Sequence, residues 1–294
     1  MQGKDVTGEQ IREAVRKRSG VLAELADDSQ RKPALVERLD VSRSTADRAI
    51  DELIDAGLAE RDGGVYRATN AGKLALDVHR EYASLTDGIG TAMPMIEAKS
   101  PDAPFDTTLL ADGAVQLAEP HAPENALRET AESLREAEVV RGLAPVIKSS
   151  YASLLYEQVQ ERNLEVELIV ERDARESLTA VADNRAELAN LLAADEVQVL
   201  ETGADLPYAL WLMSGPDIDR TGITVHDSGG IVGVITNDSA DAVEWCRSRY
   251  ESVREDADPF PVDSLERIGG LERGRGRKTR SGRPESEPPG RFRV

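Results

Sequence analysis

Residues 35–72 read LVERLDVSRSTADRAIDELIDAGLAERDGGVYRATNAG, and their order predicts the structure of the first part of the chain. Ser42 is a typical N-cap, and apolar residues follow it at helical spacing until Gly57, which is typical of a helix end. Pro33 suits the first turn of a preceding helix that ends near Asp40. Two short helices joined by about three residues have the geometry of a helix-turn-helix, whose second helix presents its N-terminal turn to the major groove.

A hairpin is predicted immediately after these helices. The turn residues Asp62, Gly63 and Gly64 lie between two short strand-like runs, 58–61 and 65–68, and this turn sequence favours a tight connection. The hairpin would form a wing beside the second helix. Upstream, the capping-box spacing of residues 7–10 predicts a helix that Gly20 interrupts and a second amphipathic run that ends at residues 27–29.

This order of helix, turn, second helix, glycine stop, Gly-Gly hairpin and new helix resembles the archaeal and bacterial winged-helix transcriptional regulators. The resemblance implies a DNA-binding domain that uses the start of its second helix. The candidate DNA-contacting residues of that helix are Ser42, Arg43, Ser44, Thr45 and Arg48. Basic residues around it are expected to contact phosphates, which positions the domain without reading sequence; they are Arg31, Lys32, Arg61, Arg67 and Lys73. Winged helices also bind proteins, and that role is the alternative.

A linker helix is expected from Asn70 to about Thr86. One of its faces is apolar and consists of Leu74, Val78, Tyr82 and Leu85. This stripe either packs against the wing domain or forms the seam of a homodimer, and a dimer is favoured because operator readers usually bind as two-fold dimers. Residues 88–105 contain three prolines and two glycines, so we interpret them as a connecting segment and place the domain boundary near Gly88.

Charge divides the chain into three segments. The whole sequence has 36 basic and 55 acidic side chains and a net charge of −19. Residues 1–82 carry 14 basic and 16 acidic side chains, residues 83–263 carry 13 and 35, and residues 264–294 carry 9 and 4. With seven lysines and 4% aromatic residues, the composition resembles that of proteins from halophilic archaea. A near-neutral head can bind DNA there, because the Debye length of about 3 Å in 1 M salt screens the acidic body.

Predicted strands and helices alternate in the acidic part of the chain. The expected elements are a hairpin at 109–117, a helix at 124–137, a strand at 139–147, a helix at 151–162, a strand at 166–170, a helix at 175–192, strands at 197–200 and 209–213, a hairpin at 223–236 that turns at 228–230, and a helix at 240–253. Repeated strand–helix units predict a mainly parallel sheet that helices cover and antiparallel strands extend. The fold class is therefore α+β or α/β, with Trp211 and Trp245 in the core.

Three segments of this part resemble the regulatory domain of archaeal winged-helix regulators of the methanogenesis and filament-regulator type. They are EVVRGLAPVI at 138–147, NLEVELIVERDARESL at 163–178 and DLPYALWLMSGPDIDRTGITVHDSGGIVGVITNDSADAVEWCRSRYE at 205–251. The resemblance covers about residues 108–258 and implies a degenerate phospholipase D-like domain used for ligand sensing. That superfamily's His-x-Lys motif is missing, because His226 is followed by Asp227 and Ser228. We therefore expect no phosphodiester hydrolysis by this route and no enzyme activity.

A small-molecule effector, if there is one, would bind at the loops after the parallel strands. The weak candidates there are Arg141, Lys148, Tyr151, Arg172 and Asp173. No cofactor and no metal site are expected, because one cysteine and three scattered histidines leave few ligands. The sequence has no signal-peptide-like start and no run of about 18 apolar residues, which favours a cytoplasmic protein that does not enter a membrane.

These observations predict a winged helix-turn-helix domain with its linker helix at 1–87, an acidic α/β regulatory domain at 88–263 and a disordered basic tail at 264–294. The predicted function is a sequence-specific transcriptional regulator that binds double-stranded promoter DNA and responds to an effector or partner. A non-enzymatic scaffold or ligand-binding protein, whose winged helix contacts other proteins, is the alternative. A hydrolase built on the acidic part is a further one.

Overall fold

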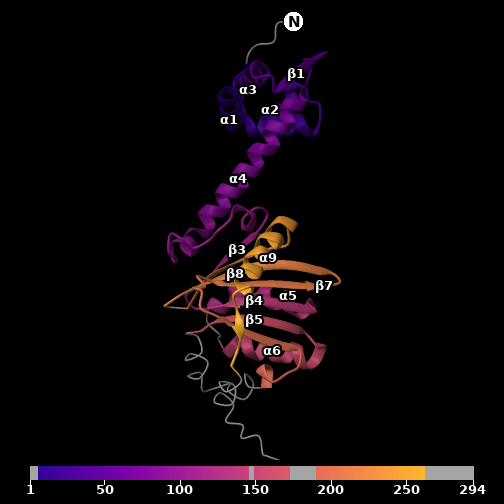
Figure 1. The fold of residues 1–294 in the computed structure, drawn as a ribbon. Coiled ribbons are helices and arrows are strands. Elements are labelled where there is room, and N and C mark those ends of the chain that lie inside the picture. The colour runs from indigo at the N-terminus through magenta and orange to yellow at the C-terminus, as the bar shows by residue number, and fades with distance from the viewer. Residues whose placement is uncertain (1–5, 146–148, 173–189, 229, 262–294) are drawn as a thin grey trace, which may run out of the picture.

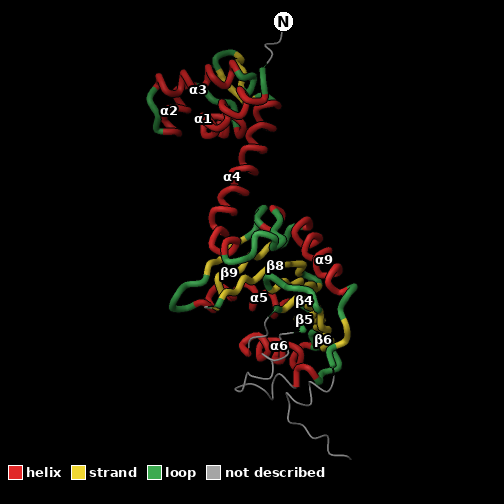
Figure 2. The backbone as a smooth tube through the Cα atoms, turned by 60° about the vertical axis from the view of Figure 1, so that its left-hand side comes forward, coloured by secondary structure: helices red, strands yellow, loops and turns green. Residues whose placement is uncertain are grey.

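The computed structural model describes residues 6–145, 149–172, 190–228 and 230–261. A small helical head and a larger α/β body are joined by one long helix, α4 (Asn70–Glu97), which holds the head away from the body (Figures 1 and 2). The predicted tail at 264–294 and most of the helix predicted at 175–192 lie outside the described residues. Within the described residues, no helix is both long and apolar enough to cross a membrane.

The head contains every element that residues 35–72 predict. Its elements are α1 (Gly8–Asp27), α2 (Lys32–Leu39), α3 (Arg43–Asp55), β1 (Ala59–Asp62) and β2 (Val65–Ala68), followed by the start of α4. The two strands pair antiparallel, and both glycines of the turn between them, Gly63 and Gly64, have positive φ, as a tight hairpin requires. Apolar side chains from α1, α2 and α3, from both strands of the hairpin and from the start of α4 form one core.

The predicted interruption of the first helix is present, but it lies at Arg18, two residues before Gly20. Helix α1 continues through this exposed glycine to Asp27, and its irregular backbone lies at Arg18, where φ is −129° and ψ is 19°. A glycine lowers helix stability by about 1 kcal/mol relative to alanine. Burial of apolar residues on both sides of Gly20 offsets this cost. Leu22 and Leu25, which follow the glycine, are fully buried in the head core.

The prediction of a connecting segment at 88–105 is wrong over its first ten residues. Helix α4 continues through Gly88, Gly90 and Pro94 to Glu97. Ala92 and Met95, in its last turns, have no exposed surface and belong to the core of the body. Burial in the body therefore outweighs the low helix propensity of glycine and proline. As a result, a single helix connects the two cores.

The body is built on a mixed sheet. Its described strands are β3 (Ala114–Leu117), β4 (Val139–Ala144), β5 (Glu165–Glu171), β6 (Val197–Thr202), β7 (Ala209–Gly215), β8 (Ile218–Asp227), β9 (Gly230–Asn237) and β10 (Asp258–Pro259), in the spatial order β10-β6-β5-β4-β7-β8-β9-β3. Within this order, β4–β5 and β5–β6 are parallel and the other neighbouring pairs are antiparallel. The prediction of a mainly parallel sheet is therefore wrong, because β7 returns beside β4 and starts an antiparallel meander.

The body departs from the predicted elements at two further places. Residues 107–117 form the short helix η1 (Thr107–Leu109) and the edge strand β3, which pairs with β9 and not with a hairpin partner of its own. The helix expected at 124–137 begins as the 3-10 helix η2 (Pro123–Leu127) and continues as α5 (Arg128–Glu136). The expected helices at 151–162 and 240–253 are present as α6 (Ser149–Arg162) and α9 (Ala240–Arg254).

Helices cover the two faces of the sheet differently. Helix α9 and the end of α4 pack on one face, and α5 and α6 pack on the other (Figure 1). Each face has its own apolar core, one around Ile223, Val225 and Met95, the other around Val166, Trp211 and Leu164. The fold is mixed α+β.

Candidate nucleic-acid interface

The turn between α2 and α3 is fixed by its own backbone and by one serine. Asp40 has a left-handed conformation, with φ of 48° and ψ of 45°, and its N–H donates to the carbonyl of Val36. The Ser42 side chain then accepts the backbone N–H of Thr45 at 3.1 Å and caps α3. Both ends of the turn are therefore held, and the direction of α3 relative to α2 is set locally.

Helix α3 has one buried and one exposed face. Ala46, Ala49, Ile50 and Leu53 are at most 1% exposed. Arg43, Ser44, Thr45 and Arg48 are exposed on the other side. The first turn contains no acidic residue, so the positive end of the helix dipole and the Arg43 guanidinium act in the same direction. This arrangement suits an anionic partner.

The three hydroxyl residues at the start of α3 are not equivalent. The Ser42 hydroxyl lies 2.9 Å from that of Ser44 and 2.8 Å from that of Thr45, in addition to its capping bond. Ser42 therefore positions the turn. Ser44 and Thr45 are exposed, and their hydroxyls can exchange the hydrogen bonds to Ser42 for bonds to a ligand.

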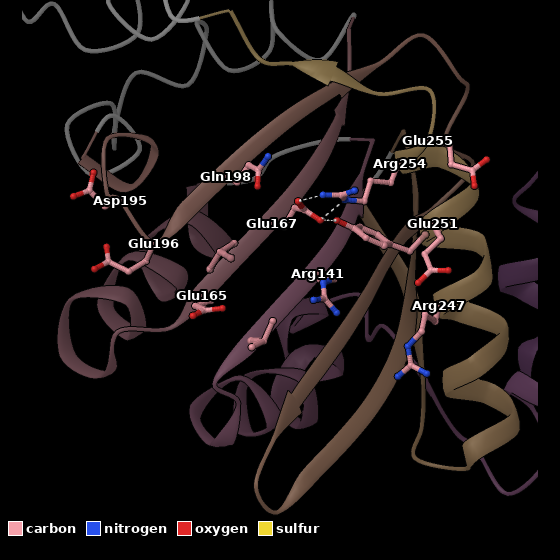
Figure 3. A pocket seen from close by; sticks show the side chains of 13 residues that line it. Arg141, Glu165, Glu167, Asp195, Glu196, Gln198, Arg247, Glu251, Arg254 and Glu255 are labelled. Atoms are coloured by element: carbon pink, nitrogen blue, oxygen red, sulfur yellow. Dashed lines mark hydrogen bonds and ion pairs between the residues drawn. The ribbon is translucent and has the colours of Figure 1, made fainter.

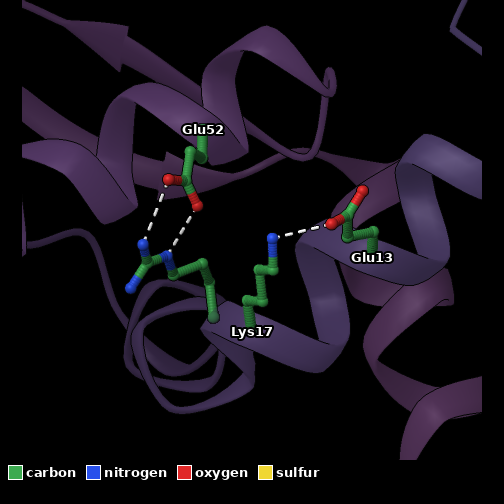
Figure 4. Close-up of polar contacts among 4 residues, drawn as sticks. Glu13, Lys17 and Glu52 are labelled. Atoms are coloured by element: carbon green, nitrogen blue, oxygen red, sulfur yellow. Dashed lines mark hydrogen bonds and ion pairs between the residues drawn. The ribbon is translucent and has the colours of Figure 1, made fainter.

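An ion pair ties α3 to the kink in α1. Arg18 donates from Nε and Nη2 to the two carboxylate oxygens of Glu52, at 2.7 and 3.1 Å (Figure 4). The Arg18 hydrogen bond holds the pKa of Glu52 below its usual range. Lys17, directly before Arg18 on α1, pairs with Glu13 at 2.7 Å, one turn earlier on the same helix. No local sequence pattern predicts the Arg18–Glu52 pair, because the two residues lie 34 positions apart.

Two of the predicted phosphate contacts already have acidic partners. Lys32 Nζ lies 2.6 Å from Asp47 Oδ1, and the hydrogen bond to Asp47 raises the pKa of Lys32. In the wing, Arg67 Nε lies 2.7 Å from Glu60 Oε1 of the opposite strand. These carboxylates reduce the local positive charge that a phosphate would meet.

The other predicted phosphate contacts lie on three different elements. Arg61, on the wing, has its guanidinium 5.7 Å from the ring centroid of Tyr66. Arg31 directly precedes α2, and Lys73 lies in the first turn of α4; both are exposed. Tyr66 itself is buried, and Lys32 also lies 5.5 Å from its ring, so one aromatic side chain supports basic groups of α2 and the wing.

A close contact seats α4 against the strand that leads into the wing. A Cβ at Gly72 would lie 2.0 Å from the carbonyl oxygen of Leu58, so only glycine fits there. Thr69 caps α4 by accepting the N–H of Gly72 at 3.0 Å and donates to the carbonyl of Gly57 at 2.7 Å. The sequence signal for this contact is a glycine three residues after a capping threonine.

The effector candidates in the body are not gathered in one site. Arg141 points into a groove of about 830 Å³ beside α9, whose floor includes Glu167 (Figure 3). Arg172 lies 3.3 Å from Glu201 and 3.3 Å from Asp258. Lys148 and Asp173 lie outside the described residues. Tyr151 belongs to α6 by its backbone, but its side chain is not described.

An ion pair dominates the polar groove. Arg254 donates from Nε and Nη2 to Glu167 at 2.7 and 3.0 Å, and the Tyr250 hydroxyl donates to the same carboxylate (Figure 3). The Arg254 hydrogen bond is the main reason why the pKa of Glu167 lies below its usual range. This cluster joins α9 to β5 and is explained as packing of the helix on the sheet.

Comparison with solved structures gives weak likenesses. TrmBL2, an archaeal chromatin protein, is 11% identical with a TM-score of 0.36, and the match covers 86% of this chain and 100% of that chain. NucT from Helicobacter pylori is 12% identical with a TM-score of 0.40, and covers 51% and 99%. Nuc from Salmonella typhimurium, a phospholipase D family member, is 8% identical with a TM-score of 0.37, over 51% and 99%.

Comparison with protein families is more informative. No curated protein matches the chain significantly. Two family models do match, one over most of the head and α4 and one over most of the body. Residues 8–93 match the model of the family described as HVO_A0261 N-terminal domain, and residues 123–256 match the model of the family described as Methanogenesis regulatory protein FilR1, middle domain.

Proposed function

We propose that this protein is a sequence-specific transcriptional regulator whose head is a winged helix-turn-helix domain that binds double-stranded DNA. The observation that carries the proposal is the start of α3, where Arg43, Ser44, Thr45 and Arg48 are exposed while the opposite face is fully buried. A DNA-reading helix needs this division, because side chains that reach base edges must lie on a helix whose position is fixed. The description of the matched regulatory family supports the same role.

Arg43 and Arg48 are the side chains that read bases. An arginine on a helix in the major groove donates two hydrogen bonds to guanine, and this contact distinguishes it from the other bases. Arg31, Arg61 and Lys73 flank the helix on neighbouring elements and contact phosphates. Lys32 and Arg67 contribute less, since each must share its charge with Asp47 or Glu60.

The protein binds its operator as a homodimer through the exposed stripe of α4. Leu74, Val78 and Tyr82 are 68%, 66% and 66% exposed, which is unusual for large apolar side chains that recur on one helix face. Leu85, the fourth residue predicted for this seam, is half-buried against the core of the body. The seam therefore consists of three residues from each copy and lies between head and body.

The body regulates and does not catalyse. This inference is supported by the sequence after His226, which lacks the lysine of the His-x-Lys motif. Response to an effector belongs to the body because α4 enters its core at Ala92 and Met95, so a rearrangement there would be transmitted to the head. Direct contact between the two parts is not needed for this coupling.

A selection experiment tests the proposal. The full chain is mixed with a pool of random DNA duplexes in molar KCl, bound duplexes are recovered over several rounds, and the enriched sequences are measured by gel shift. We expect one recurring sequence, arranged as two symmetric half-sites. In a parallel experiment, the immobilised full chain is exposed to an extract of its own cells. A DNA pool that stays random, together with specific proteins retained from this extract, would favour the scaffold alternative.

A further inference from the structure

The body contains a mainly apolar cavity of about 400 Å³ on the face of the sheet that α5 and α6 cover. Its described walls come from the strands β4, β5, β7 and β8 and from helices that include α5 and α6, and they contain Leu134, Val140, Leu154, Leu155, Leu168 and Met213. The size falls within the range of about 300–1,000 Å³ that is typical of small-molecule sites. It is separate from the polar groove beside α9, which lies on the opposite face of the sheet.

One tryptophan has an unusual setting in this wall. Trp211 of β7 lies opposite Gly142 of β4 and Gly222 of β8 in the ladder. A Cβ at Gly222 would lie 2.5 Å from Cζ2 of the indole, so the ring lies against a backbone that only glycine leaves open. Trp211 is 7% exposed. Gly222 thus makes room for a large flat side chain at the cavity.

Two polar atoms of this wall have no hydrogen-bond partner. They are the indole Nε1 of Trp211 and the hydroxyl of Thr130 on α5, and both residues are more than nine-tenths buried. Buried polar groups without a partner are destabilising and uncommon in folded proteins. An empty apolar volume is destabilising as well. A bound molecule would relieve both, because it would fill the space and supply the missing acceptor.

We propose that this cavity binds an uncharged, mainly apolar small molecule that carries one carbonyl-type oxygen, which accepts a hydrogen bond from Trp211 Nε1 and from the Thr130 hydroxyl. The ligand is uncharged because the charged residues of the described wall, Glu124 and Arg128, are exposed and do not form a buried partner for an ion. Both polar atoms are covered in this conformation, so the oxygen reaches them through side-chain shifts of the kind that ligands commonly induce.

Two probes of similar size isolate the hydrogen bond. Benzophenone and diphenylmethane differ only in a carbonyl group against a methylene, and their binding to the full chain is measured by titration calorimetry in molar KCl. We expect benzophenone to bind about tenfold more tightly, the equivalent of one hydrogen bond to a buried donor. If neither probe binds, or if the two bind equally, the proposal is wrong.

Four variants locate the binding. Thr130→Val and Trp211→Phe keep most of the side-chain volume, and we expect each to reduce the preference for benzophenone severalfold. Trp245→Phe, which changes the other tryptophan, on the α9 side of the sheet, should leave the preference unchanged. Ala131→Phe fills the cavity from α5 and should abolish binding of both probes. Benzophenone binding that survives Ala131→Phe, in a protein that remains folded, would overturn the assignment.

The identification of this cavity as the effector site rests on the proposed regulatory function, but the two can fail separately. Probe binding is measured without DNA, and operator binding is measured without a probe. A chain that binds its operator and neither probe refutes the cavity proposal alone. A chain that prefers benzophenone and selects no DNA sequence refutes the proposed function alone.

Discussion

At the scale of single residues, the head separates side chains that fix α3 from side chains that are presented by it. Ser42, Arg18 and Glu52 fix the helix through a cap and a two-point ion pair. Arg43 and Arg48 are exposed on its outer side. The sequence predicted the cap and the exposed residues because these depend on neighbours along the chain. It did not predict the ion pair or the acidic partners of Lys32 and Arg67, which folding brings together.

The Glu167 cluster predicts a pH dependence of stability. The carboxylate is 15% exposed and hydrogen-bonded to Arg254, and its pKa lies below the ordinary value of 4.5. A pKa that is lower in the folded state means that the contribution is fully present above the unfolded pKa and is lost as pH falls through the folded pKa. We expect Glu167→Gln to lower the free energy of unfolding by about 1 kcal/mol at pH 7.

That difference should shrink as the pH is lowered from 5 towards 3, because the wild-type carboxylate then becomes protonated. Denaturant unfolding at a series of pH values measures it. Glu165→Gln, which changes an exposed carboxylate two residues earlier on the same strand, is the control. A Glu167→Gln deficit that stays constant over this pH range would show that the lost stability is not electrostatic.

Among the elements, α4 connects the head to the body, and it extends to Glu97, well beyond the end near Thr86 that the sequence predicts. Gly88, Gly90 and Pro94 are poor helix formers, and the local sequence therefore predicts a linker. The stabilising contacts come from Ala92 and Met95 in the core of a sheet whose strands lie far along the chain. The order of strands in that sheet was missed for the same reason, since the return of β7 beside β4 leaves no local signal.

Two glycines of α4 should respond oppositely to alanine. A Cβ at Gly72 would lie 2.0 Å from a backbone oxygen of Leu58, whereas a Cβ at Gly90 meets nothing within 4 Å. We expect Gly72→Ala to destabilise the protein by about 1–3 kcal/mol, because α4 must move off the wing. Gly90→Ala should stabilise it by about 0.5–1 kcal/mol through helix propensity. Thermal unfolding of both variants measures this, and destabilisation by Gly90→Ala would contradict a continuous helix at that position.

At the scale of the whole molecule, the exposed stripe of α4 determines the assembly. We expect Val78→Asp to shift the protein from dimer to monomer in sedimentation experiments, because the seam would bury two carboxylates close together. Thr91→Asp adds the same charge to an exposed position of α4 outside the stripe and should leave the dimer intact. A wild-type chain that is monomeric at micromolar concentration would refute this seam.

Neither the polar groove nor the apolar cavity of the body is predictable from the sequence. Trp211 and Trp245 were predicted in the core, and Trp211 is buried as expected. The cavity that Trp211 lines depends on the distance between the sheet and the helices that cover it. Local residue patterns do not predict this distance. The predicted effector candidates were charged residues near strand ends, whereas the described cavity wall is mainly apolar. Arg141 lies in the other groove, on the opposite face of the sheet.

We expect the exposed start of α3 to read DNA, and the affinity of arginine variants for the selected duplex can refute this role. Arg43→Ala and Arg48→Ala are compared with Arg135→Ala, which removes the same charge from an exposed position on α5 in the body. In gel shifts in molar KCl, we predict that each head variant loses about 1–3 kcal/mol of binding free energy and discriminates less between bases at one position of each half-site, while Arg135→Ala binds like the wild type. Unchanged affinity and unchanged sequence preference in both head variants would contradict the claim.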